Sequence, residues 1–372
     1  MLKIRSTPVF PAGSRIGSSM KRHMLIAMIC MAVVTIEAGI SSAQAEGVVV
    51  RTRTDVDPPP PSEAAQAFIE TLDESQRRHA VGAINAPDRG TWTYFPGPRS
   101  GLRLGDLQPE QRVAFDRFLS AALSKTGVRR VREVLAIEPI SDRGGGVRTG
   151  PGEYWLRFYG SPEPGRPLTE DDDAATGAAT DAAPRAWAWR LEGHHLSLNV
   201  AFVDGQIVSV TPFFFGAAPS KHADFGEPLA LDDVRAEQLL SALDPIQKAA
   251  AMGIGPAPAD IRSGTGPRPK MPREGGVKAE TMSKQQRATL DGMVISLLDI
   301  WPAGTTDHLR KRWMATDPET VRFAWAGSPM RRGPHYWRVQ SPALIMEFSN
   351  SSPSVDHAHL VLRAADDEYS GR

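Results

Sequence analysis

The stretch from Trp187 to Thr211 constrains the fold of this chain more than any other part of the sequence. It reads as a long strand over residues 187–203, a turn at Asp204-Gly205 and a second strand over residues 207–211. Asp-Gly between two alternating apolar runs predicts a β-hairpin, because both turn positions need a positive φ. Successive side chains of a strand point to opposite faces of a sheet. The expected core face carries His194, Leu196, Leu198, Val200 and Phe202, and the expected polar face carries His195, Ser197, Asn199 and Ala201.

The N-terminal segment predicts export. Lys21-Arg22 precedes an apolar run over residues 24–36, and Ala43-Gln44-Ala45 follows as a small-x-small cleavage site. This order is typical of a secretory signal peptide, and the apolar run is too short to span a membrane. We therefore expect residues 1–45 to be removed. The product is expected to be secreted or periplasmic, with no membrane span.

Composition argues against a nucleic-acid partner and against disulfides or thiolate metal sites. Lys and Arg together number 43, as do Asp and Glu, so no basic excess favours a nucleic-acid partner. The only cysteine, Cys30, lies in the predicted signal peptide. The exported chain is therefore expected to have neither disulfides nor thiolate metal ligands. A small-molecule or metal ligand remains the expected kind of partner.

The rest of the chain predicts an α+β fold in which one unit occurs twice. A Leu/Met-x-x-x-Gln-basic pattern recurs at four positions, and the strand segments around Trp189-Arg190 and Trp337-Arg338 recur in the same order. Repeats of this kind indicate a duplicated supersecondary unit. We expect two helix–helix–strand–hairpin units with antiparallel sheets, related by a pseudo-twofold axis. The recurring glutamines are Gln76, Gln111, Gln247 and Gln286.

Composition also sets the expected boundaries. Runs rich in Pro and Gly favour extended connections rather than packed elements. The second repeat part is expected to pack with the first as one domain. The predicted segments are 1–45 as signal peptide, 46–62 as Pro-rich linker, 63–252 as first repeat half, 253–278 as linker and 279–372 as second repeat part.

Histidines at the ends of the two predicted hairpins form the candidate site. His357 and His359 stand at positions i and i+2 of a predicted strand, so both imidazoles point to one face. Glu347 is expected beside them, on the face that carries His195 in the other copy. We therefore expect a divalent metal ion to be bound by His195, His357, His359 and Glu347, with His194 and Glu192 supporting the ligands. Iron, zinc, copper and manganese all suit such a set.

Other interpretations of these residues stay open. Arg190, Arg363 and Asn199 are candidate substrate-binding residues, and the alternative for the arginines is a buried ion pair. The histidines alternatively bond only to Glu192 and to backbone groups. No motif identifies catalytic residues, so a metalloenzyme is one form of the metal-binding hypothesis. A metal-free module for a small molecule or a peptide is the second hypothesis, and a structural or interaction protein is the third.

Several segments resemble one known family. They are Trp187–Asn199 with its Gly-His-His, Thr211–Pro219, the segment Trp92–Pro96, and Asp356-His357-Ala358-His359 near the end. Together they resemble the bacterial domain-of-unknown-function 3500 family, over nearly the whole exported chain. The sequence departs from the family pattern at Asp356, where asparagine is expected, and after Asp367, where glycine is expected. The resemblance implies export and a shared fold, but no activity.

Overall fold

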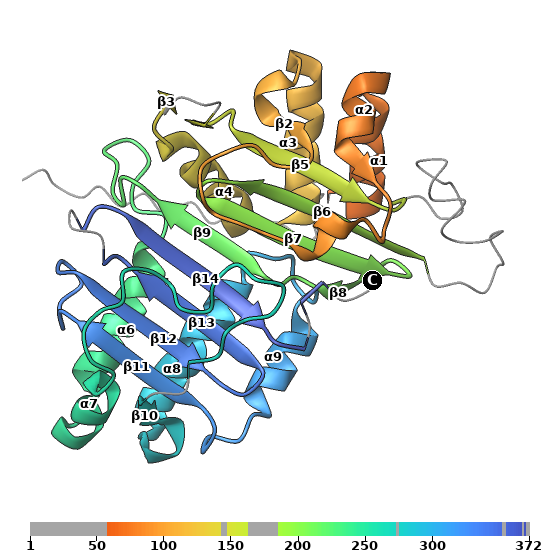
Figure 1. Cartoon of the computed structure of the whole chain (residues 1–372). Coiled ribbons are helices and arrows are strands. Elements are labelled where there is room, and N and C mark those ends of the chain that lie inside the picture. The colour runs from red at the N-terminus through yellow and green to blue at the C-terminus, as the bar shows by residue number, and fades with distance from the viewer. Residues whose placement is uncertain are drawn as a thin grey trace, which may run out of the picture. The chain divides into compact units, whose positions relative to one another are not determined.

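A large mixed β-sheet organises the protein (Figure 1). The computed structural model describes residues 58–142, 147–162, 185–272, 275–351, 355–366 and 368–369, all in the compact unit Val56–Arg372. The predicted signal peptide and most of the predicted Pro-rich linker lie outside these residues. No helix within them is both long and apolar enough to cross a membrane.

The central strands run in the order β5-β6-β7-β9-β14-β13-β12-β11, and every neighbouring pair among them is antiparallel. Short β1 extends one edge in parallel and short β10 the other edge. Strands β2 and β8 pair with β5 and β7, and β3 with β4 forms a separate ribbon. The bounds are β1 (Val81–Gly82), β2 (Leu102–Arg103), β3 (Ser141–Asp142), β4 (Arg148–Thr149), β5 (Tyr154–Tyr159), β6 (Ala186–Gly193), β7 (Leu196–Val203), β8 (Gln206–Ser209), β9 (Phe213–Ala217), β10 (Val277–Lys278), β11 (Arg322–Gly327), β12 (His335–Gln340), β13 (Leu344–Ser349) and β14 (Ala358–Ala364).

Helices cover one face of this sheet, as the predicted α+β class requires (Figure 1). Apolar side chains that alternate along the strands, such as Leu198 and Leu360, meet the helices in one continuous core. Aspartate and serine caps begin several helices, among them Asp73, Asp244 and Ser283. The α-helices of the described chain are α1 (Pro61–Glu70), α2 (Glu74–Ala80), α3 (Pro109–Ala122), α4 (Lys125–Ile137), α6 (Ala230–Ala242), α7 (Pro245–Met252), α8 (Lys284–Leu298) and α9 (Asp307–Met314).

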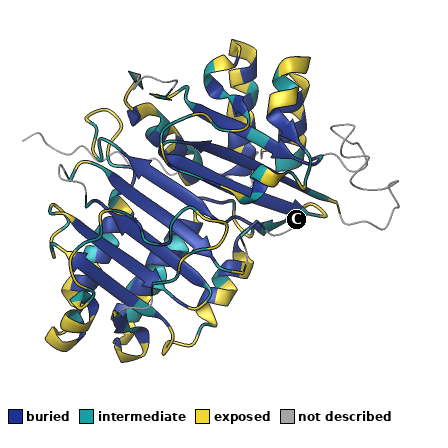
Figure 2. Cartoon of the chain, viewed as in Figure 1, coloured by how far each residue is buried: buried dark blue, intermediate teal, exposed yellow. Residues whose placement is uncertain are grey.

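Long connections, rather than helices, cover the other face of the sheet. Figure 1 shows the segment after α2 and the segment after α7 crossing in front of the strands. The strands beneath them are buried (Figure 2). Residues 253–272, expected as a linker, thus form part of this cover. Helices α6 and α7, which the predicted boundaries place in the first half, pack against α8, β10 and β11.

The organising hairpin differs from its prediction in one respect. The Asp204-Gly205 turn is confirmed, with φ values of 50° and 76°, and it joins β7 to β8. The expected long strand, however, is itself a hairpin: β6 ends at Gly193, His194-His195 form the turn, and β7 begins at Leu196. The apolar positions change from odd numbers (Trp187, Trp189 and Leu191) to even numbers (Leu196, Leu198 and Val200) across this turn, and that change is a local sign of the break. The prediction of one long strand missed it, because no Asn, Asp or Gly stands in the two-residue turn itself.

Two glutamine pairs, in which only Gln76 is not fully buried, tie helices together. Gln76 and Gln111 hydrogen-bond each other through both side-chain amide groups, and so do Gln247 and Gln286. Gln111 also donates from Nε2 to the Thr71 carbonyl at 2.9 Å. The pairs join α2 to α3 and α7 to α8, so the recurring pattern of the sequence corresponds to recurring contacts.

Replacing Gln111 with alanine is expected to lower the free energy of unfolding by about 1–3 kcal/mol. The substitution leaves the Gln76 amide and the Thr71 carbonyl without this partner in a largely buried place. Urea unfolding followed by circular dichroism measures the change. Arg117→Ala, at an exposed position of the same helix, is the control and is expected to change stability by less than about 0.5 kcal/mol. Equal effects of the two substitutions would contradict the prediction.

Candidate metal centre

Four histidines from two distant segments of the chain meet at one end of the central strands. His194 and His195 form the turn between β6 and β7, while His357 precedes β14 and His359 lies within it. Strand β9 runs between β7 and β14, and its Gly216 is the register partner of His359. A Cβ at Gly216 would lie 2.5 Å from His195 Cδ2. The glycine therefore leaves the space in which imidazoles from both sides of β9 meet.

The imidazole nitrogens are close together. His357 Nε2 lies 2.9 Å from His195 Nε2 and 2.9 Å from His359 Nε2. The His194 ring stacks on that of His195 with centroids 3.9 Å apart. One nitrogen from each of His194, His195 and His357 falls within 4.8 Å of the others, as in a metal-binding group. The structure thus brings together the two histidine pairs that the sequence analysis placed at one site.

Two carboxylates hold the other ring nitrogens. Glu138, just after α4, lies 2.8 Å from His194 Nδ1 and 2.6 Å from His195 Nδ1. Asp260 lies 2.7 Å from His359 Nδ1. Burial raises the pKa of Glu138, but hydrogen bonds from the two imidazoles outweigh it and bring the pKa to about 2. Burial also raises the pKa of Asp260, but the interactions with His359, together with hydrogen bonds from the Ile261 backbone N–H and the Tyr94 hydroxyl, outweigh it and lower the pKa.

These contacts fix where the protons lie. An ionised carboxylate only accepts hydrogen bonds, so Nδ1 of His194, His195 and His359 each carries the proton. Their Nε2 atoms then present lone pairs when the rings are neutral. Burial lowers the pKa of His195 to about 4 despite its bond to Glu138. Burial, with the neighbouring histidines, lowers the pKa of His357 to about 3. Neutral rings with free lone pairs are the form in which histidine binds metals.

Glu347 and Glu192, expected at the site, have other partners. Glu347 accepts hydrogen bonds from the Tyr336 hydroxyl at 2.6 Å and from the backbone N–H groups of residues 262 and 263. Glu192 forms an ion pair with Arg99 at 2.9 Å and accepts a hydrogen bond from Ser197. Glu347 lies on the polar face, as expected, whereas Glu192 shares the face of Ser197 only because the chain turns at His194-His195. Neither carboxylate is part of the group of close ligand atoms that His194, His195 and His357 form.

The candidate substrate-binding residues bond to the protein's own groups. Arg190 donates to the carbonyls of Asp88 and Thr91 at 2.8 and 2.7 Å. Asn199 donates to the Pro212 carbonyl at 2.9 Å. Arg363 is fully buried and donates to three carbonyls of residues 263–266 and to Glu368. Each arginine therefore fastens a connection to the polar face of the sheet, and substrate binding by these residues stays a prediction.

Glu138 and Asp260 are not among the residues that the sequence predicts at the site. Glu138 stands between a helix and Pro139, and Asp260 lies in the segment expected as a linker. Neither local pattern differs from that of a solvated carboxylate. Their role is set by contacts with histidines 56 and 99 residues away along the chain.

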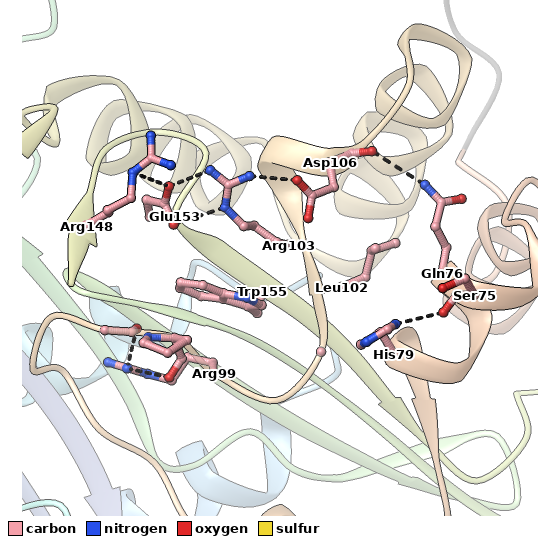
Figure 3. Close-up of a pocket in the computed structure, with 13 residues that line it drawn as sticks. Ser75, Gln76, His79, Arg99, Leu102, Arg103, Asp106, Arg148, Glu153 and Trp155 are labelled. Atoms are coloured by element: carbon pink, nitrogen blue, oxygen red, sulfur yellow. Dashed lines mark hydrogen bonds and ion pairs between the residues drawn. The ribbon is translucent and has the colours of Figure 1, made fainter. Parts of the chain in front are cut away.

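A separate pocket of about 490 Å³ opens between α2, β2 and β5. Figure 3 shows the Trp155 ring inside it, with Arg148, Arg103 and Glu153 joined by ion pairs on one side. None of the four clustered histidines lines this pocket. Trp155 is the register partner of Glu192, so the pocket opens near the hairpin that carries His194 and His195.

Comparison with known proteins gives one match. A family model described as protein of unknown function (DUF3500) matches residues 60–169 and 177–371. No curated protein and no solved structure matches the chain. The matched residues include all four histidines, Glu138 and Asp260.

Proposed function

This chain belongs to the DUF3500 family, whose function is unknown, and from this premise we propose that it is an exported metal-binding protein. The proposed ion binds between the β6–β7 turn and the start of β14. His195 and His357 are its central ligands, with His194 and His359 on either side. Glu347 is left out of this ligand set because its oxygens accept hydrogen bonds elsewhere.

The contact of His357 Nε2 with two other ring nitrogens carries the proposal. His195 and His359 each direct a lone pair at that atom, because their Nδ1 protons face carboxylates. A proton on His357 Nε2 can be donated to only one of them, so the lone pair of the other faces that nitrogen at 2.9 Å with no proton between them. An unprotonated His357 Nε2 would instead oppose lone pairs at both contacts. A cation among these nitrogens would remove the conflict, since each lone pair would then bind it.

Elemental analysis by mass spectrometry tests the proposal on residues 46–372, exported natively and without a tag. We expect about one ion per chain, and N-terminal sequencing of the exported chain is expected to begin at Glu46. A chain that remains empty after incubation with iron, zinc, copper and manganese salts would contradict the metal centre. A chain retained in the cytoplasm with its first residues intact would contradict export.

Replacing Gly216 with alanine is expected to weaken metal binding about 10- to 100-fold, as loss of an outer-shell partner does. The new Cβ would lie 2.5 Å from Cδ2 and 3.0 Å from Cγ of His195, so the ring has to move away from His357. Calorimetric titration of the metal-free protein measures the affinity. Gly292→Ala is the control, because a Cβ on that helical residue meets nothing within 4 Å. Unchanged affinity in the Gly216 variant would show that His195 is not a ligand.

Metal-free binding of a small molecule is a second candidate function, favoured by the pocket that contains Trp155. Its volume of about 490 Å³ lies within the range of small-molecule sites. A compound screen by nuclear magnetic resonance, with and without a chelator, separates the two functions. Binding that persists in the chelator and shifts the Trp155 signal supports this candidate. Binding that depends on the metal assigns the ligand to the histidine centre.

We also propose that the chain contains two copies of one unit. Matching glutamine pairs and the sheet order support this, since β5-β6-β7-β9 is followed by β14-β13-β12-β11. In an experimental structure, residues 61–217 are expected to superpose on residues 230–364 with the same order of elements. Failure of the paired glutamines to coincide in that superposition would contradict the duplication.

A further inference from the structure

The metal centre also contains carboxylates that no ligand role requires. Resting on the metal centre proposed above, we propose that it is charge-matched to a divalent cation. Glu138 and Asp260 would supply the two balancing negative charges, and the imidazoles would supply the ligand atoms. The class of ion is therefore divalent and nitrogen-preferring, as zinc, copper(II) and nickel are.

Of the two carboxylates, Glu138 gives the stronger support for a bound cation. Its side chain is 1% exposed. Its hydrogen-bond and ion-pair partners among the described residues are His194, His195 and Tyr154, none of which carries a fixed positive charge. Burying a carboxylate without a counter-charge is costly, and proteins place a cation or a metal beside it. An ion bound by His194 and His195 would place a fixed positive charge directly behind the two rings that Glu138 contacts.

Asp260 makes the equivalent contact on the other side of the centre. It accepts from His359 Nδ1, and the Tyr94 hydroxyl also bonds to it. Each carboxylate thus faces one end of a ring whose other nitrogen points to the centre. This carboxylate–histidine–metal order transmits negative charge to the ligand nitrogen and raises its basicity. Two such carboxylates balance a charge of +2, whereas a monovalent ion would leave the cluster negative.

The atoms that face the centre argue against magnesium and calcium. Both carboxylates turn oxygen atoms toward ring N–H groups, so the centre presents nitrogen rather than oxygen to an ion. Magnesium and calcium require oxygen ligands. We therefore expect zinc to bind in the presence of excess magnesium and calcium.

Calorimetric titration with Zn²⁺ and with Ag⁺ tests the charge match, because both ions bind imidazole but differ in charge. The proteins are wild type, Asp260→Asn and Glu138→Gln, with Glu133→Gln on α4 as the control. Asparagine still accepts the His359 Nδ1 proton, so Asp260→Asn changes charge with little change of geometry. In both variants we expect Zn²⁺ affinity to fall about 10- to 100-fold, Ag⁺ affinity to fall by a clearly smaller factor, and the control to bind both ions like wild type.

The other possible results of these titrations decide between a role of the carboxylates in charge balance and a role in orienting the rings. Equal weakening of Zn²⁺ and Ag⁺ would overturn the charge match, since the carboxylates would then only orient the rings. Unchanged Zn²⁺ affinity in both variants would overturn it as well. Retained Ag⁺ binding shows that a variant is folded around its histidines. A wild type that binds neither ion would overturn the metal centre itself, which separates failure of the proposed function from failure of this inference.

Discussion

Replacing His195 and His357 together with alanine is expected to remove stoichiometric metal from the protein and to lower metal affinity by more than about 100-fold. That loss exceeds the 10- to 100-fold effect of an outer-shell partner because two ligand nitrogens disappear. The two rings come from opposite sides of β9 and touch at 2.9 Å. Elemental analysis of the exported variant, beside calorimetric titration of its metal-free form, measures the effect.

The folded state of this double variant needs its own control. His79→Ala/His222→Ala removes two histidines outside the cluster and is expected to keep the metal content of wild type. Circular dichroism should show that both variants have the same secondary structure. Stoichiometric metal in a folded His195/His357 variant would place the ion elsewhere, and the clustered rings would then be a polar contact.

Replacing Arg363 with alanine is expected to lower the free energy of unfolding by about 3–5 kcal/mol, the cost of breaking a buried ion pair on one side. The guanidinium is fully buried, forms a two-point ion pair with Glu368, and donates to the carbonyls of residues 263, 264 and 266. Its removal leaves the Glu368 carboxylate, 2% exposed, without that cation. Urea unfolding of the metal-free protein gives the change directly.

Two further variants separate the contribution of geometry from that of charge. Arg363→Lys keeps the positive charge but loses the planar donors, so we expect it to recover only part of the lost stability. Arg322→Ala, on an outer strand of the same sheet, is the control and is expected to cost less than about 1 kcal/mol. A loss below that value for Arg363→Ala would favour the role in binding an anionic substrate that the sequence suggested.

Local chemistry decides which parts of this fold could be predicted. The turn at Asp204-Gly205 could be predicted because these two residue types themselves favour positive φ. The i and i+2 spacing of His357 and His359 gives their common direction, since it needs only the pleat of a strand. The turn at His194-His195 contains no turn-forming residue, and its sequence signal is the weaker one of apolar positions that change from odd to even numbers across it.

The ligand environment depended on contacts that the sequence does not encode locally. Alternation placed Glu347 on the correct face but could not show that two backbone N–H groups of a distant connection would occupy its oxygens. Glu138 and Asp260 reach the histidines only after a helix end and a loop pack against the sheet. The metal hypothesis could therefore be reached from the histidines alone, whereas its carboxylates could not.

The position of β14 has a consequence for biogenesis. This strand, the last in the described chain, enters the middle of the sheet between β9 and β13. Until residues 358–364 emerge during synthesis, β9 and β13 each have one unpaired edge, and such edges are sites of non-specific strand association. His357 and His359 arrive with the same segment. A chain truncated before β14 would therefore be prone to aggregation and would lack both His357 and His359 of the proposed centre.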